Sequence, residues 1–204
     1  NEIFLTSKLW NDEQGYDTTL KAFDDTLKRL GTDYLDLFLI HWPKDKNEES
    51  WKALEKLYKD GRVKSIGVSN FKEHHLDDLL TEAEIVPMIN QVELHPQFPQ
   101  EEIRKYCKEK GIVVEAWASL MQGQIFDKEK VKRIAEKHGK TISQIGIRWA
   151  VQIGVVTIPK STHTQRIKDN LNVFDFELDN EDMIKMAELN TGVRIGKDPD
   201  KIDF

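Results

Sequence analysis

Short apolar runs alternate along this chain with longer segments of helical period, and this alternation constrains the fold more than any other feature. Nearly continuous apolar runs are typical of strands buried in a parallel sheet, with helices as the connections between them. The chain is therefore predicted to be an α/β protein made of successive strand–helix units. The expected strands are Glu2–Lys8, Tyr34–His41, Val63–Val68, Met88–Val92, Ile112–Trp117 and Val155–Pro159.

Helical segments fill the intervals between these strands. In the first of them Leu20, Phe23 and Leu27 share one helical face, and Gly31 follows its end, a pattern typical of an amphipathic helix. Ser50 is predicted to be the N-cap of the next helix. The expected helices are Thr18–Leu30, Trp51–Asp60, Lys72–Thr81, Gln100–Lys110, Lys128–His138, Ile142–Ile153 and Asn180–Asn190.

The number of strand–helix units indicates which parallel architecture is present. A (β/α)8 TIM barrel has eight strands and typically about 250 residues, whereas this chain has six expected strands in 204 residues. We expect one barrel domain over residues 1–204 that lacks about its first two β/α units, since the chain begins at Asn1, without Met, in a predicted strand. The competing architecture, an open doubly wound sheet, would carry a Gly-rich turn after its first strand, and this chain has none.

Composition narrows the function and the compartment. The net charge of -6 argues against general nucleic-acid binding, and no leader or membrane-spanning apolar run is visible. The single cysteine, Cys107, lies in a charged helical stretch and is expected to have no catalytic role. We therefore expect a cytoplasmic protein without nucleic-acid or membrane partners.

Polar or aromatic residues stand where the predicted strands end. In a parallel barrel the active site lies at the carboxyl ends of the strands. Each such residue alone could have a purely structural role. Polar or aromatic residues at all six strand ends, however, predict an active site at one end of the barrel. The residues are Lys8, His41, Ser69 with Asn70, Gln91, Trp117, and Lys160 with Ser161.

Several longer motifs, in the same order along the chain, resemble those of the aldo/keto reductases. The motifs are Phe4–Trp10, Leu30–Asp36, Leu39–Pro43, Gly67–Phe71, Asn90–Pro96, and Ile158–Ser161 followed by Arg166 and Asn170. The resemblance covers essentially the whole chain. The short loop after Pro43 and the tail at Asp198–Asp200 resemble the bacterial branch that includes diketogluconate and glyoxal reductases.

The resemblance implies reduction of aldehydes and ketones by hydride transfer from NADPH. The family uses an Asp, Tyr, Lys and His tetrad, in which the Tyr is the acid, and Lys8 and His41 match the last two. A cation beside a phenol favours the phenolate, which suits Lys8 to its implied role. The Asp and Tyr come from a segment that precedes Lys8 in the family, and no tyrosine here has the matching context. Residues 1–204 alone are therefore expected to be inactive.

The resemblance also implies a nicotinamide site and a substrate pocket. Ser69, Asn70 and Gln91 would bind the carboxamide, whose amide group needs both donors and acceptors. Trp117 would stack on the nicotinamide ring. Apolar walls for the carbonyl substrate would come from Trp10 and Trp42.

The rest of the cofactor would lie along a basic, hydroxyl-rich loop. Arginine forks and helix N-termini suit phosphate groups, so this loop matches the family's site for the adenosine 2′-phosphate and favours NADPH. Asp169 would contact adenine. Where the family often has Ser-Pro-Leu after the stacking aromatic, this chain has Ala118-Ser119-Leu120, and Ser119 and Leu120 are expected to replace those cofactor contacts. The loop residues are Lys160, Ser161, Thr162, Arg166 and Asn170.

Two other functions remain open from the residues. Lys8 could form a Schiff base in a barrel aldolase, although that reading leaves the Ser-Asn, Gln and Lys-Ser residues unexplained. A reductase-like barrel that only binds cofactor is the second. No metal is expected, and we expect the intact enzyme to be a monomer acting on a small carbonyl compound. The physiological substrate depends on loops near residues 43–50 and 122–128 and on the tail 192–204.

Overall fold

The computed structural model describes residues 3–204, so Glu2, the expected start of the first strand, lies outside the described residues. The chain divides into two compact units, which are described separately. The first unit comprises Asn1–Gln91, Glu102–Val113 and Pro199–Phe204, and the second comprises Val92–Glu101 and Val114–Asp198.

The first unit is built on parallel strands paired in chain order. These are β1 (Thr6–Leu9), β2 (Leu37–Ile40), β3 (Ile66–Ser69) and the first part of β4 (Ile89–Glu93). Parallel pairing confirms the expected strand–helix units, since it requires a crossover after each strand. The helices are α1 (Tyr16–Leu30), α2 (Asn47–Lys59), α3 (Glu73–Glu82) and α4 (Glu101–Lys110), with the 3₁₀ turns η1 (Asn11–Glu13) and η3 (Pro199–Lys201).

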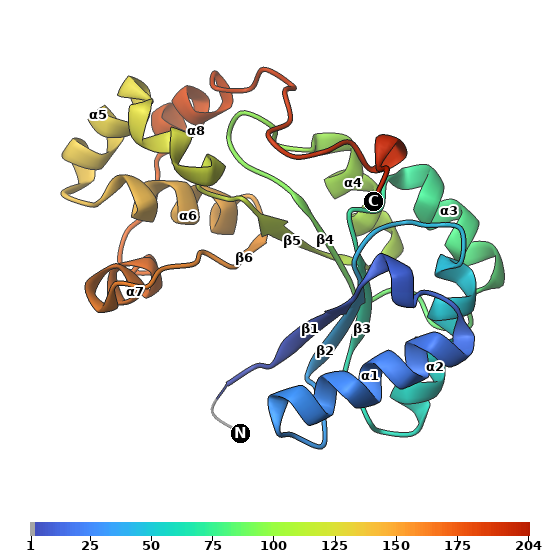
Figure 1. Ribbon diagram of the computed structural model, residues 1–204. Helices are drawn as coiled ribbons and strands as arrows, with labels where there is room; N and C mark the ends of the chain where they lie inside the picture. The colour runs from blue at the N-terminus through green and yellow to red at the C-terminus, as the bar shows by residue number, and fades with distance from the viewer. Residues whose placement is uncertain (1–2) are drawn as a thin grey trace. The chain divides into compact units, whose positions relative to one another are not determined.

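Apolar burial explains why α1 and α2 lie side by side next to β1, β2 and β3 (Figure 1). Every residue of β2 is buried, and Phe38 meets Phe23 of α1 edge to face at a ring distance of 5.2 Å. Trp51 of α2 is 1% exposed, and its indole N–H donates to the carbonyl of Ile85 at 3.1 Å. The helices thus bury one face each and leave the charged face in solvent.

The prediction that Ser50 caps α2 is wrong. The helix begins at Asn47, about one turn before the expected Trp51, and Ser50 is completely buried within it. The Ser50 hydroxyl donates to the Lys46 carbonyl at 2.9 Å and accepts from the Gly15 backbone N–H at 2.8 Å. The hydroxyl of Ser50 therefore binds the backbone at the start of α1 and does not cap a helix end.

The second unit contains the last two strands and four helices. Strands β5 (Val113–Trp117) and β6 (Val156–Thr157) pair in parallel, and β6 ends before Pro159, which lacks the N–H needed to continue the ladder. Thr141 and Gln144 form a reciprocal capping box at the start of α6. The other elements are η2 (Met121–Asp127), α5 (Glu129–His138), α6 (Ile142–Gln152), α7 (Thr164–Leu171) and α8 (Asn180–Ala187).

The six strands and all seven expected helices are confirmed, with bounds shifted by a few residues. A further short helix, α7, carries Arg166 and Asn170. Within residues 3–204, no helix has the length and apolar character to cross a membrane.

Gly67 lies in β3, opposite Ile89 of β4. A Cβ at this position would overlap the carbonyl oxygen of Ile89 and lie 2.8 Å from Cδ2 of Leu39. We expect Gly67→Ala to lower the free energy of unfolding by about 1–3 kcal/mol, as in other overpacked cores, measured by urea denaturation. The control is Val86→Ala, at a side chain 46% exposed, where the change should stay within about 0.5 kcal/mol. Equal stability of the Gly67 variant and the native protein would contradict this description of the contact.

Candidate active site

Lys8 and His41 lie at the carboxyl ends of neighbouring strands. Lys8 pairs with Leu39 in the β1–β2 register, and His41 follows β2 directly, its backbone N–H donating to the Leu9 carbonyl at 3.1 Å. Burial, together with the positive charge of Lys8, lowers the pKa of the half-buried His41 to about 4. His41 is therefore neutral near pH 7 and carries one ring N–H that can donate a hydrogen bond.

A buried polar network extends this site to the ends of β3 and β4. The Ser69 hydroxyl donates to the Gln91 carbonyl at 2.9 Å, and the backbone N–H of Asn70 donates to the same carbonyl at 2.8 Å. The Asn70 amide donates to Ser69 Oγ at 3.1 Å and to the His41 carbonyl at 3.0 Å. The side chains of Ser69 and Asn70 and the backbone of Gln91 thus lie together, and Asn70 lies next to His41.

Two tryptophan rings contact the His41 ring, and a phenylalanine packs on both of them. Trp10 meets the His41 ring edge on at 5.1 Å, and Trp42 stacks near it at 6.1 Å. Phe204 stacks on Trp10 at 5.8 Å, meets Trp42 at 5.5 Å, and accepts a 2.9 Å hydrogen bond from the Asn11 amide at its backbone carbonyl. Trp10 and Phe204 remain 41% and 38% exposed. The group offers an apolar surface beside a neutral hydrogen-bond donor.

In the second unit, Trp117 ends β5 and begins an unusual loop. Its carbonyl accepts a hydrogen bond from the Leu94 backbone N–H at 3.2 Å. Ala118, Met121 and Gln122 all have positive φ angles, of 56°, 57° and 51°, which non-glycine residues rarely adopt. Such strained backbone is common next to binding sites, and this loop borders a pocket.

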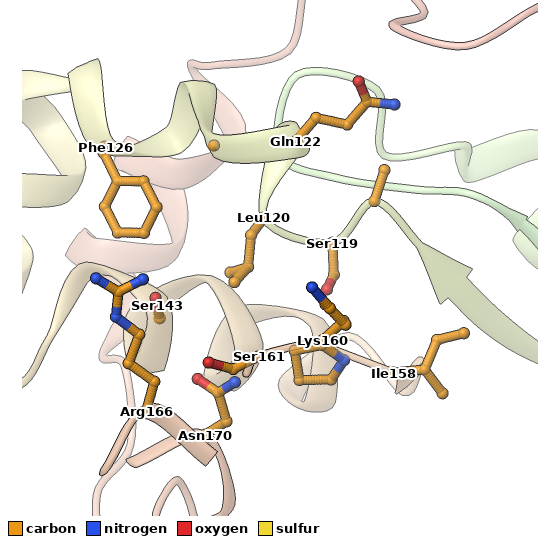
Figure 2. A pocket seen from close by; sticks show the side chains of 13 residues that line it. Ser119, Leu120, Gln122, Phe126, Ser143, Ile158, Lys160, Ser161, Arg166 and Asn170 are labelled. Carbon is orange, nitrogen blue, oxygen red and sulfur yellow. The ribbon is translucent and has the colours of Figure 1, made fainter. Parts of the chain in front are cut away.

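Two positively charged side chains line that pocket (Figure 2). It has a volume of about 330 Å³, and Lys160 and Arg166 point into it with Ser161 and Asn170 drawn between them. Within residues 3–204, neither cation has an acidic partner, so each is available to an anion. The complete lining is Ala118, Ser119, Leu120, Gln122, Gly123, Phe126, Ser143, Ile158, Pro159, Lys160, Ser161, Arg166 and Asn170.

A second hollow of about 480 Å³ shares part of this lining. It brings Asp169 together with Arg166, Asn170 and Phe126, and the carboxylate of Asp169 accepts a 2.9 Å hydrogen bond from Gln165. Thr162, also expected in the site, is exposed and lines neither hollow.

The family follows from comparison with known proteins. The sequence pattern of the aldo/keto reductase family matches residues 1–191. The chain belongs to this family. It is similar to the glyoxal reductase of Bacillus subtilis (strain 168), with 58% identity over the whole chain and 74% of that protein. It is also 43% identical to a methylglyoxal reductase of Escherichia coli O157:H7, over 98% of the chain and 74% of that protein.

Solved aldo/keto reductases have the same fold. A structure from a Medee basin deep-sea metagenome library is 48% identical, with a TM-score of 0.97. A Gox0644 variant in complex with NADPH is 46% identical, with a TM-score of 0.96. Each match covers 100% of this chain and 76% of the other. The fold is therefore that of the (β/α)8 barrel reductases, of which these residues form about three quarters, and the open doubly wound sheet is excluded.

Sequence reasoning missed several residues of this reductase that the structure places at the hollows or beside His41. Phe126 and Ser143 line the pocket from η2 and α6, although neither ends a strand. Phe204 was included only within the tail 192–204. The sequence shows that the tail carries an aromatic residue, Phe204, but it does not indicate that this residue contacts Trp10.

Two other groups with reactive side chains are explained by structure. Cys107 is fully buried, and burial raises the pKa of its thiol to about 11, so it stays protonated. Asp200 of the tail accepts hydrogen bonds or ion pairs from Lys72 at 2.6 Å, His74 at 3.1 Å and His75 at 3.2 Å. The other ring nitrogen of His75 accepts from the Lys72 backbone N–H, so the nitrogen that faces Asp200 carries the proton and donates. Through these contacts Asp200 holds the tail against the start of α3.

Proposed function

We propose that the protein reduces small aldehydes and ketones to alcohols with NADPH, and that Lys8 and His41 belong to its catalytic group. The observation that carries this proposal is the Lys8–His41 pair next to the Ser69–Asn70–Gln91 network. A neutral histidine, a cation and a set of amide groups at one strand-end cluster are what carbonyl reduction requires. The relatives named glyoxal and methylglyoxal reductases support small α-oxoaldehydes as the substrate class.

The residues present fit the cofactor. Lys160 and Arg166, without acidic partners in residues 3–204, line a pocket with hydroxyl and amide groups, as a phosphate ester needs. NADPH, when bound, supplies the hydride. In this proposal Ser69, Asn70 and Gln91 bind the carboxamide, Trp117 stacks on the nicotinamide, and Ser119 and Leu120 line the path of the pyrophosphate. Asp169 contacts adenine, and Thr162 belongs to the loop around the 2′-phosphate.

The chemistry at the carbonyl follows from charge. Reduction builds negative charge on the carbonyl oxygen, and a positioned donor stabilises it. His41 is neutral, so it donates its ring N–H to that oxygen. The family pattern places the proton donor, a Tyr, before Lys8, in a segment that these 204 residues do not include. Lys8 favours the phenolate form of that Tyr and so makes its proton easier to release. Trp10, Trp42 and Phe204 hold the apolar side of the substrate.

A direct assay tests this function. Purified full-length protein is mixed with NADPH and methylglyoxal, and the decay of NADPH absorbance is followed. We expect turnover that requires both reactants and is slower with NADH. A parallel sample with borohydride tests the aldolase alternative, since a Schiff base on Lys8 would be trapped as a stable adduct. Trapping of the carbonyl compound on Lys8 without NADPH oxidation would overturn the proposal in favour of that alternative. NADPH binding without turnover of any small aldehyde would favour a non-catalytic barrel.

A further inference from the structure

A buried carboxylate in the second unit fastens an irregular stretch of the C-terminal segment. Glu93, at the end of β4, is 0% exposed and accepts from the backbone N–H groups of Ile195 at 2.5 Å and Gly196 at 3.1 Å. His95 Nε2 lies 3.0 Å from the same carboxylate, and the Arg194 guanidinium lies 3.7 Å from it. Burial raises the pKa of Glu93, but the hydrogen bonds from His95, Ile195 and Gly196 outweigh this and hold it below its usual value.

Further contacts hold this stretch along its length. The Thr191 backbone N–H donates to the Gln97 carbonyl at 3.0 Å, and the Arg194 guanidinium lies 4.6 Å from the centre of the Phe98 ring. His95 is also fully buried, and its Nδ1 has no hydrogen-bond partner within residues 3–204. A buried nitrogen without a hydrogen-bond partner lowers stability. We call residues 191–196 the strap.

The strap lies directly against Trp117. A Cβ on Gly196 would overlap Cη2 of the indole and lie 3.3 Å from Cζ2 and 3.0 Å from Oε2 of Glu93. The φ angle of Gly196 is not in the left-handed region, so the backbone conformation does not require glycine. Close approach to the indole requires it. Gly196 is thus packed between the carboxylate of Glu93 and the edge of the Trp117 ring.

We propose that Glu93 and Gly196 are positioning residues for Trp117. Glu93 holds the strap through the backbone of Ile195 and Gly196, and the strap sets the orientation of the indole that stacks on the nicotinamide ring. This inference rests on the proposed function for the role of Trp117. It assigns to a buried carboxylate and a tail glycine the alignment of the cofactor ring, although neither touches the cofactor.

The first test observes Trp117 without any cofactor. The protein is labelled with 5-fluorotryptophan, and the resonance of Trp117 is assigned by its loss in Trp117→Phe. We expect Gly196→Ala to shift this resonance, because the added methyl displaces the ring edge. We expect Glu93→Gln to shift or broaden it, because the strap loses the negative charge and one of the two acceptor oxygens that hold it. The control is Val193→Ala, in the same strap but 54% exposed. An unmoved Trp117 resonance in both variants would overturn the proposal.

The second test is a double-mutant cycle on NADPH binding. Aromatic contacts contribute about 0.5–1.5 kcal/mol, so we expect Gly196→Ala to weaken NADPH binding about two- to tenfold. In the Trp117→Phe background the same substitution should have almost no further effect, since the shorter ring leaves room for a methyl. Equal weakening in both backgrounds would refute a route through Trp117.

The two failures are distinguishable. If Trp117→Leu, which removes the aromatic ring, leaves NADPH affinity and turnover unchanged, the proposed stacking role of Trp117 is wrong. The fluorine shift caused by Gly196→Ala would then still show that the strap positions the ring. If Gly196→Ala does not fold, the Trp117 resonance can be measured in Glu93→Gln instead, because Glu93 binds the backbone of the strap. KM for the aldehyde should change less than kcat, because the substrate pocket at His41 is not part of the strap.

Discussion

Lys8→Met is expected to lower kcat/KM for aldehyde reduction by about 10²–10⁴-fold, the range that general acid catalysis contributes. Lys8 lies beside His41 at the strand ends, and in the proposed mechanism it makes the Tyr proton easier to release. NADPH affinity should change little, because the cations proposed to bind its phosphates, Lys160 and Arg166, lie on another part of the chain. Steady-state kinetics with methylglyoxal, together with NADPH binding by fluorescence, provide the measurement.

An independent signal accompanies this loss. Burial is the larger cause of the low pKa of His41, and the charge of Lys8 lowers it further. Lys8→Met should therefore raise the His41 pKa from about 4 toward, but not to, its usual value, as followed by NMR titration. The control is Lys28→Met, at a side chain that is 77% exposed and forms an ion pair with Asp25. Native-like activity in Lys8→Met would remove Lys8 from the catalytic group, whatever the titration showed.

Arg166→Ala is expected to weaken NADPH binding by about 10- to 150-fold while leaving NADH binding nearly unchanged. A hydrogen bond to a charged group contributes about 1.5–3 kcal/mol, which corresponds to that range of affinity. Arg166 lines both hollows, whereas Lys168 on the same helix lines neither. Lys168→Ala is therefore the matched control for a general loss of positive charge.

The salt dependence separates a specific phosphate contact from general attraction. A screened, diffuse effect would fall for both cofactors as salt rises, and Lys168→Ala would then resemble Arg166→Ala. Equal weakening of NADPH and NADH by Arg166→Ala would show that this residue does not recognise the 2′-phosphate.

Much of the local structure could be predicted from the sequence, because strand and helix patterns depend on near neighbours. The apolar face of Leu20, Phe23 and Leu27 predicted α1, and the expected strand–helix alternation is present. Errors concerned positions where a distant residue decides. Ser50 had the chemistry of a cap, but its hydroxyl binds Gly15, 35 residues away.

The candidate site divides in the same way. Lys8, His41, Asn70 and Gln91 could be selected because each lies at or near the carboxyl end of a predicted strand, and register alone brings the ends of neighbouring strands together. Phe126, Ser143 and Phe204 could not, since no local pattern marks a residue that reaches a hollow from another element.

The sequence by itself determined the order of strands and helices, the family, and the set of polar residues at the strand ends. Only the tertiary structure decided the low pKa of His41, which depends on how deeply the ring is buried beside Lys8. It also decided that Glu93 would bind the backbone of Ile195, 102 residues further along the chain. In the sequence, nothing distinguishes Gly196 from other glycines of the tail. The requirement for glycine at this position arises only because the strap packs against the indole of Trp117. Periodicity is a property of neighbours in the chain, whereas burial and close approach depend on which distant segments fold against each other.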